Sequence, residues 1–342
     1  MSPREGTSPG YPSVLPRLVG RADLKLLLKL PFSFLLAAAV PERAWPDTCD
    51  HIVRLSRRLH PGPAVREATA IQEITRDAGF GGSPTVIQQA LQRNIRLNQL
   101  YYLASWKPGG WRADIRLEGR EHLDRALAAG HGVILWVAPF VFASLVAKRA
   151  LHEAGVRVHH LSSAAHGFSS TRLGLAVLNP IRTRIEDRYI AERITIPLDG
   201  AVAGAKQTIS RCLEANGVVS ITLVPRGARC IEFPFHGGRL RMALGAASFA
   251  LRSGAALLPV FSVRTGSRFV TTIEPALPSS VDLDREEALR ALGRAMANRV
   301  AEWVASYPGQ FYWQLDSLLR VGSDGHSAPP AGRHRRAADQ RA

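Results

Sequence analysis

Residues 132–150 read as a strand that passes directly through a turn into a helix. The uninterrupted apolar run from Val133 to Ala138 predicts a fully buried strand, and the segment from Ala143 to Ala150 predicts a helix. α/β enzymes place their chemistry at such strand ends. Pro139 opens the turn but has no side-chain base, and Ser144 has a hydroxyl that holds no charge at neutral pH. The turn therefore lacks the imidazole and the carboxylate that general-base catalysis normally uses.

Three histidines elsewhere in the chain are candidates for a substitute base. His160 ends the next predicted strand, 156–161, directly after His159, and His166 lies in the loop beyond it. If this strand is a parallel neighbour of the first, these side chains open onto the same crevice as Pro139. His236 lies in a later loop. For each one, a role as a polar loop or capping residue is the alternative to a role as a base or a substrate contact.

Further motifs follow in an order that resembles a known family. They are the short strand 156–161, the loop from Glu232 to Arg239 with Phe-Pro-Phe-His-Gly-Gly-Arg, a small-residue helix at 244–255, a Pro-Val-Phe strand at 257–264, and the aromatic stretch from Trp303 to Trp313. Together they resemble the lysophospholipid acyltransferase superfamily, in particular its bacterial branch of lipid A late (lauroyl/myristoyl) acyltransferases. The resemblance covers roughly residues 30–319.

The resemblance implies roles for several positions. In the family, the turn after the strand carries a His and, after four intervening residues, an Asp or Glu; Pro139 and Ser144 stand there, so we interpret the motif as degenerate. It also places Arg226 near a loop whose Arg holds an acceptor phosphate, and His236 beside the active site. Arg239 and Arg264 are further candidates for substrate binding, with solvated surface arginines as the alternative.

The alternation of predicted strands and helices indicates an α/β fold with a mostly parallel or mixed central sheet flanked by helices, preceded by N-terminal helices at 64–77 and 84–102. With 342 residues, 46% of them hydrophobic, the chain can bury one large domain. We expect a disordered N-terminus at 1–20, an interfacial helical segment at 21–62, an acyltransferase-like α/β domain at 63–320, and a disordered basic tail at 321–342.

The net charge of +16 indicates an anionic partner. No helix-turn-helix, finger spacing or aromatic-interleaved basic strand is present, so nucleic acid is disfavoured. The remaining partners are an anionic membrane surface and acyl-CoA or an acyl-carrier protein, each of which would be a substrate rather than a cofactor. The three cysteines are too scattered for a zinc site or a disulfide framework, and we expect neither a metal nor a bound cofactor.

The segment from Leu24 to Val40 is apolar but interrupted by Lys25, Lys29 and Pro31. Its uninterrupted part is shorter than the ~20 residues that cross a bilayer. A helix lying on the cytoplasmic face of the cell membrane, with its lysines at head-group level, is one interpretation. A buried N-terminal helix of the domain is the other.

Two functions follow from these observations. The first is transfer of an acyl group from acyl-CoA or acyl-carrier protein to a lipid or amphiphilic acceptor at the membrane surface; an amine acceptor needs less help from a base than an alcohol does. The second is a catalytically inactive homologue that binds lipid, acyl chains or a partner protein at the membrane.

Overall fold

The computed structural model describes residues 17–75, 82–107, 109–227, 229–278, 283–313 and 319–321. Of the two ends expected to be disordered, 1–20 and 321–342, only residues 17–20 and Val321 belong to these ranges; the rest lie outside the described residues.

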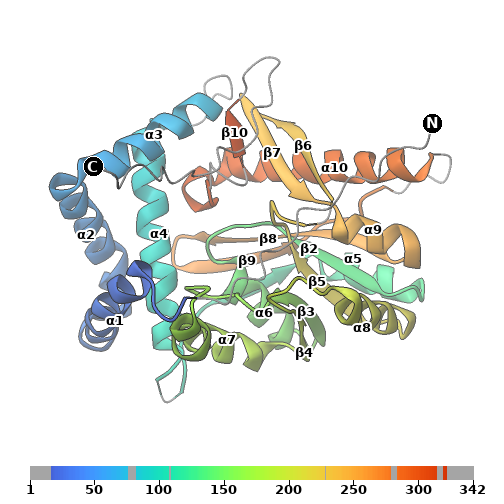
Figure 1. Cartoon of the computed structure of the whole chain (residues 1–342), viewed down its shortest axis with the longest axis horizontal. Helices are drawn as coiled ribbons and strands as arrows, with labels where there is room; N and C mark the ends of the chain where they lie inside the picture. Colours follow the sequence, from blue (N-terminus) through green and yellow to red (C-terminus); the bar gives the residue numbers. More distant parts are fainter. Residues whose placement is uncertain are drawn as a thin grey trace, which may run out of the picture.

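A seven-stranded mixed sheet forms the centre of the protein, with the strand order β1-β9-β8-β2-β5-β3-β4 (Figure 1). In that order the strands are β1 (Ile115–Glu118), β9 (Arg268–Ile273), β8 (Ala256–Thr265), β2 (Val133–Val137), β5 (Val218–Thr222), β3 (Val158–Ser163) and β4 (Glu192–Ile196). The five strands from β8 to β4 run parallel, whereas β9 is antiparallel to β8 and β1 is parallel to β9. This arrangement confirms the predicted fold class.

Strand β2 lies inside the sheet because its five residues are all apolar. Each of them is buried, which is typical of a parallel sheet covered by helices on both faces. The helices after β1 are α5 (Arg120–Ala128), α6 (Ala143–Glu153), the π-helical turn η2 (Gly174–Leu178), α7 (Pro180–Glu186), the short η3 (Asp187–Tyr189), α8 (Ala203–Glu214) and α9 (Gly245–Ser253). The predicted helix that begins at Ala143 is thus α6.

A second, antiparallel sheet has the order β10-β7-β6 and lies beside the long helix α10 (Figure 1). Its strands are β6 (Cys230–Phe235), β7 (Gly238–Ala243) and β10 (Leu319–Val321). Helix α10 (Arg285–Ser306) begins at Asp284, whose carboxylate accepts a hydrogen bond from the Glu287 amide at 2.8 Å. The short helix η4 (Pro308–Gln310) follows and leads to the aromatic stretch that ends at Trp313.

Four N-terminal helices form a layer at one end of the main sheet (Figure 1). They are α1 (Arg21–Ala39), α2 (Trp45–Leu59), α3 (Pro61–Thr75) and α4 (Pro84–Ala104), with the short η1 (Glu42–Ala44) between the first two. The Asn98 amide of α4 donates to the Val141 carbonyl at 2.8 Å, and the Asn94 amide donates to the Gly309 carbonyl at 2.7 Å. Helix α4 therefore lies across the carboxyl end of β2, where the candidate chemistry was predicted.

Candidate active site

The turn after β2 is fixed by backbone hydrogen bonds from three directions. The Ala138 amide donates to the Val260 carbonyl of β8 at 2.9 Å, and the Leu223 amide donates to the Val137 carbonyl at 2.8 Å. Beyond Pro139, Phe140 forms an antiparallel bridge with Phe311. The aromatic stretch near the end of the chain thus closes over the turn, which the sequence order alone did not indicate.

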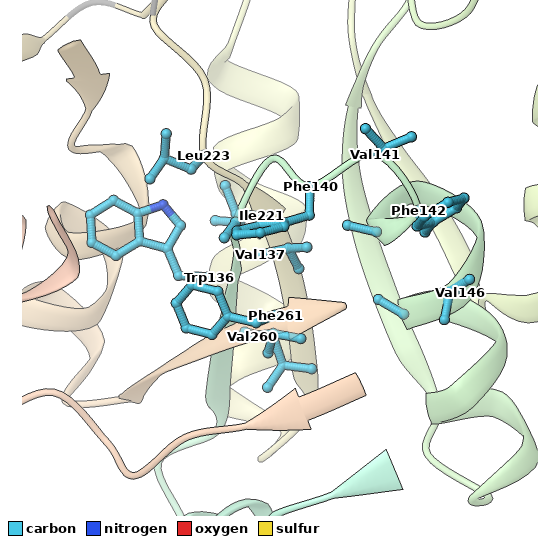
Figure 2. Packing of buried hydrophobic residues seen from close by; sticks show 14 of the residues in the cluster. Trp136, Val137, Phe140, Val141, Phe142, Val146, Ile221, Leu223, Val260 and Phe261 are labelled. Atoms are coloured by element: carbon cyan, nitrogen blue, oxygen red, sulfur yellow. The ribbon is translucent and has the colours of Figure 1, made fainter. Parts of the chain in front are cut away.

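Apolar side chains fill the turn itself. Phe140, Val141 and Phe142 are each at most 1% exposed. The ring of Phe140 lies 6.0 Å from that of Phe261, and the ring of Phe142 lies 5.3 Å from that of Phe269. Figure 2 shows Phe140, Val141, Phe142 and Phe261 among the core side chains around β2 and the turn. By contrast, Pro139 and Ser144 are half-buried, so both positions border the surface of the turn.

A buried ion pair lies one helical turn beyond Ser144. The Lys148 ammonium of α6 donates to the Ser144 carbonyl at 2.8 Å and to the Glu186 carboxylate of α7 at 3.0 Å. Lys148 is 5% exposed, and Glu186 is fully buried. Burial lowers the pKa of Lys148, although the neighbouring Glu186 offsets part of that effect. A carboxylate is therefore held near the position where the family has its acid, but it comes from another helix.

Glu186 collects hydrogen bonds from several elements. The Tyr102 hydroxyl donates to it at 2.7 Å, His166 Nε2 lies 3.0 Å from both of its oxygens, and Arg193 Nη2 lies at 3.3 Å. Burial opposes ionisation of the carboxyl, but Lys148, the His166 hydrogen bond and Arg182 outweigh it. The pKa of Glu186 is consequently held well below its ordinary value, and the group is a carboxylate at neutral pH.

His166 is the partly exposed member of this cluster. Its side chain is 26% exposed, compared with 0% for Glu186. An ionised carboxylate only accepts hydrogen bonds, so Nε2 of His166 carries the proton that faces Glu186. In the neutral imidazole, Nδ1 then holds the lone pair and is able to accept a proton. A histidine oriented by a buried carboxylate is an arrangement that is able to act in general-base catalysis.

His160 does not occupy the position predicted for it. The expectation that β2 and β3 are neighbours is wrong, because β5 lies between them. Strand β3 also continues to Ser163, so His160 lies within the strand, 5% exposed, with Nδ1 at 2.7 Å from the Ser220 hydroxyl of β5. Burial and the nearby Lys148 hold the pKa of His160 well below its ordinary value. It is a neutral, buried histidine without access to a substrate.

His236 lies in the turn between β6 and β7, in the second sheet. Its ring is 4.8 Å from that of Phe235, which stacks on Phe311 at 5.9 Å, and Phe311 in turn packs on Phe140. Two aromatic rings thus separate His236 from the turn after β2. Burial lowers the pKa of His236. The structure does not bring His160, His166 and His236 into one crevice; of the three, only His166 joins the cluster beside Ser144.

The three candidate arginines lie in different places. Arg226 is exposed in the loop that follows β5, the neighbour of β2. Arg239 is exposed on β7 of the second sheet, where its backbone pairs with Arg320. Arg264 is half-buried near the end of β8, and the Gln310 side chain bonds both its backbone amide and its carbonyl at 2.8 Å. Arg226 and Arg264 remain candidates at the edge that carries the turn.

Of the cluster around Glu186, only His166 was predicted; Tyr102, Lys148, Glu186 and Arg193 were not. The sequence pattern could have identified Lys148, since it is a cation four residues after Ser144 in a helix that is otherwise mostly apolar. No pattern in the sequence distinguishes Glu186 from other acidic residues. Glu186 comes from the irregular region between β3 and β4, and only the packing of α7 against α6 brings it to Lys148.

The family model and the two curated proteins that are similar to this chain are all named as acyltransferases. The family model described as bacterial lipid A biosynthesis acyltransferase matches residues 213–320, from the end of α8 to β10. Two curated proteins of Mycobacterium tuberculosis, from strains H37Rv and CDC 1551, are similar to this chain and are both named phosphatidylinositol mannoside acyltransferase. They are 28% and 27% identical over 196 residues, which is 57% of this chain and 57% of each relative's length.

Proposed function

Because residues 213–320 match the lipid A biosynthesis acyltransferase family and the chain is similar to two phosphatidylinositol mannoside acyltransferases, we propose that it transfers an acyl group to an amphiphilic acceptor at a membrane surface. The acyl donor is acyl-CoA or acyl-carrier protein. The observation that carries this proposal is the pair of His166 with the buried carboxylate of Glu186, which Lys148 links to the Ser144 carbonyl. In our interpretation, Pro139 and Ser144 stand at the positions of the family's His and acid. The His166–Glu186 pair supplies the base that these two positions lack.

In this mechanism His166 Nδ1 takes the proton from the hydroxyl or amine of the acceptor. The acceptor oxygen or nitrogen forms a bond to the thioester carbonyl carbon, the carbon–sulfur bond breaks, and the leaving thiolate receives the proton from the imidazolium. Glu186 stabilises the transient imidazolium through Nε2, and Lys148 and Tyr102 hold the carboxylate in place. Both a hydroxyl and an amine acceptor are compatible with this step, and an amine depends less on the base than a hydroxyl does.

The membrane-surface part of the proposal rests on helix α1. In the described residues no helix is both long and apolar enough to cross a bilayer. One face of α1 nevertheless exposes large apolar side chains: Leu24 is 55% exposed, Leu28 81%, Phe32 59% and Leu35 64%. These residues recur at helical spacing, and Lys25 and Lys29 lie beside them. An apolar face flanked by lysines is typical of a helix that lies at a lipid interface, here on the cytoplasmic side.

The same helix is also part of the folded domain. Leu30, Leu36 and Ala37 are buried, and the Asp23 carboxylate accepts a hydrogen bond from the Thr171 hydroxyl at 2.7 Å. The two sequence interpretations thus apply to opposite faces of α1. Deletion of residues 1–45 would remove Trp45, which is 2% exposed and packs 5.6 Å from Tyr101, and would damage the core. Membrane association is therefore better tested by substitutions on the exposed face.

We expect Leu28→Gln with Leu35→Gln to lower the affinity for anionic vesicles by at least about tenfold, because burial of each leucine in the interface contributes about 1.5–3 kcal/mol. Co-sedimentation with vesicles measures this effect. Binding by the wild type should weaken at high salt, since Lys25 and Lys29 act through screened charges. Unchanged binding by the double variant would show that another surface anchors the protein.

The filled turn favours a second candidate function, a catalytically inactive homologue that binds lipid or a partner protein. Phe140, Val141 and Phe142 occupy the turn where a catalytic His would need space. If the chemistry has been lost there, wild-type protein transfers no acyl group to a standard acceptor such as a lysophospholipid.

We expect Pro139→His with Ser144→Glu to gain partial transfer to a lysophospholipid, because the two changes place a base and an acid in the turn while the strand, turn and helix around them are present. Acyl transfer by the wild type and the double variant, side by side, is the measurement. Ser144→Glu alone is the control, since it adds an acid without a base. Robust transfer by the wild type would mean that our interpretation of positions 139 and 144 is wrong.

The primary proposal is tested with acyl-CoA and acyl-carrier protein as donors and with vesicles that contain either amine-bearing or hydroxyl-bearing amphiphiles. Release of free thiol together with the appearance of the acyl chain in the lipid fraction would support it. Thiol release without acylated lipid would indicate hydrolysis only. The absence of both with every acceptor would favour the inactive homologue.

A further inference from the structure

A groove between α2, α3 and α4 lies outside the candidate active site. It encloses about 400 Å³, and three arginines of α2 line it: Arg54, Arg57 and Arg58. Among the described residues, only Arg54 of these three has an acidic partner, the Asp50 carboxylate at 3.3 Å. Arg57 donates at 3.4 Å to the Thr85 carbonyl and at 3.3 Å to the Gln89 side chain, both of which are neutral. The groove therefore carries excess positive charge, which attracts an anion.

A smaller chamber adjoins this groove and shares Arg57 with it. The chamber encloses about 160 Å³, and its lining includes Glu67, Gln88, Gln92 and Arg96. The Glu67 carboxylate is already occupied, because it accepts hydrogen bonds from the amides of Gln88 at 2.9 Å and Gln92 at 3.0 Å. It does not neutralise the arginines of the groove by direct contact in the described part of the chain.

Two buried polar atoms at this chamber have no protein partner among the described residues. They are Nε of Arg96, which is a donor, and Oε1 of Gln88, which is an acceptor. Gln88 is 2% exposed. Leaving such groups unsatisfied costs about 1–3 kcal/mol each. A ligand that carries both an acceptor oxygen and a hydroxyl donor would satisfy them, whereas a bare anion would satisfy only the arginine.

The three helices around the groove also expose aliphatic side chains. Val65, which lines the groove, is 58% exposed, and Leu55, Leu59 and Val86 on the same helices are each more than half exposed. In addition, α1 and α2 lie on the side of α4 that faces away from the main sheet (Figure 1). Arginines surrounded by exposed aliphatic side chains suit an amphiphile with an anionic head, rather than a water-soluble phosphate.

We propose that the groove between α2, α3 and α4 binds the hydroxyl-bearing phosphodiester headgroup of an anionic phospholipid. Arg57 and Arg58 contact the phosphate. The headgroup hydroxyls bind in the chamber, at Gln88 and Arg96, and the exposed aliphatic side chains of the surrounding helices contact the acyl region of the lipid. The groove thereby selects the lipid at which the protein docks. This inference rests on the proposed action at a membrane surface and adds a headgroup preference to it.

The test compares vesicles of phosphatidylcholine that contain either phosphatidylglycerol, which has headgroup hydroxyls, or phosphatidylmethanol, a phosphodiester of the same charge without a headgroup hydroxyl. We expect Arg57→Gln with Arg58→Gln to lower the affinity for phosphatidylglycerol vesicles by about tenfold or more, since charge-assisted hydrogen bonds to phosphate are lost. Arg125→Gln with Arg211→Gln is the control with the same charge change, on exposed positions of α5 and α8. We expect the control to bind within about twofold of the wild type.

The wild type should also prefer phosphatidylglycerol over phosphatidylmethanol, and this preference should disappear in the Arg57 and Arg58 variant. An equal loss in the control variant would show that net charge alone drives binding and would overturn the proposal. Displacement of the vesicles by inorganic phosphate at low concentration would overturn it too, because the site would then hold free phosphate.

The headgroup proposal and the catalytic proposal are contradicted by different measurements. Acyl transfer to detergent-dispersed acceptor does not require docking at a bilayer, so the Arg57 and Arg58 variant should keep it. If that variant binds vesicles normally while Leu28→Gln with Leu35→Gln does not, the headgroup site is wrong and the membrane action of α1 stands.

Discussion

His166→Gln is expected to lower acyl transfer by about 10²–10⁴-fold, the usual contribution of a positioned general base. Gln is chosen because its side-chain amide is able to donate to Glu186 as Nε2 of His166 does, at 3.0 Å, but has no basic nitrogen. The buried carboxylate therefore keeps a partner, and the fold should persist. Thiol release from the acyl donor, measured together with the urea midpoint, separates a catalytic effect from unfolding.

His159→Gln is the matched control for that substitution. His159 lies on β3 beside His160, and its Nδ1 is 2.9 Å from the Glu192 carboxylate, so it is also a histidine paired with an acid. It is not connected to Lys148, and its replacement should leave the rate unchanged. His236→Ala should leave it unchanged as well. Full activity in His166→Gln would contradict the assignment of His166 as the general base. A large loss in His236→Ala would indicate that His236, in the second sheet, is the base instead.

Acid is expected to destabilise the fold in two stages, because two buried groups bind protons less readily in the folded chain than in the unfolded one. His160 comes first. Burial and Lys148 hold its pKa well below 6.5, so as the pH falls below about 6.5 the unfolded chain takes up a proton that the folded chain does not. Stability then falls by about 1.4 kcal/mol per pH unit.

Glu186 adds the second stage. Its folded pKa lies well below 4.5, so its stabilising charge is fully present above that pH and is lost as the pH falls further. Protonation of Glu186 would leave Lys148 and Arg193 without their buried counter-charge. Both groups therefore act in the same direction, and the steepest loss is expected below about pH 4.5.

Urea unfolding at a series of pH values measures both stages. His160→Asn keeps a polar partner for the Ser220 hydroxyl but does not titrate, so this variant should lose less stability than the wild type between about pH 6.5 and 4.5. His159→Asn serves as the control, because its side chain is partly exposed. Identical pH profiles for His160→Asn and the wild type would contradict the assignment of the first stage to His160.

The location of the catalytic candidate was only partly predictable. The strand from Val133, the turn at Pro139 and the helix from Ala143 follow from local patterns and are present as β2, the turn and α6. The partner of His166 was not predictable, because Glu186 is 20 residues away along an irregular segment. A carboxylate becomes recognisable as functional only when its burial and its donors are known.

By itself the sequence determined the elements and the fold class. The apolar run of β2 predicts a buried strand, because alternation and run length depend on neighbouring residues alone. The sequence also determined that positions 139 and 144 carry no base and no acid. The tertiary structure alone decided that β5 separates β2 from β3, that His160 is buried while His166 is not, and that Phe311 closes over Phe140. The physical reason is that strand order and side-chain environment depend on contacts between residues far apart in the chain, which no local pattern records.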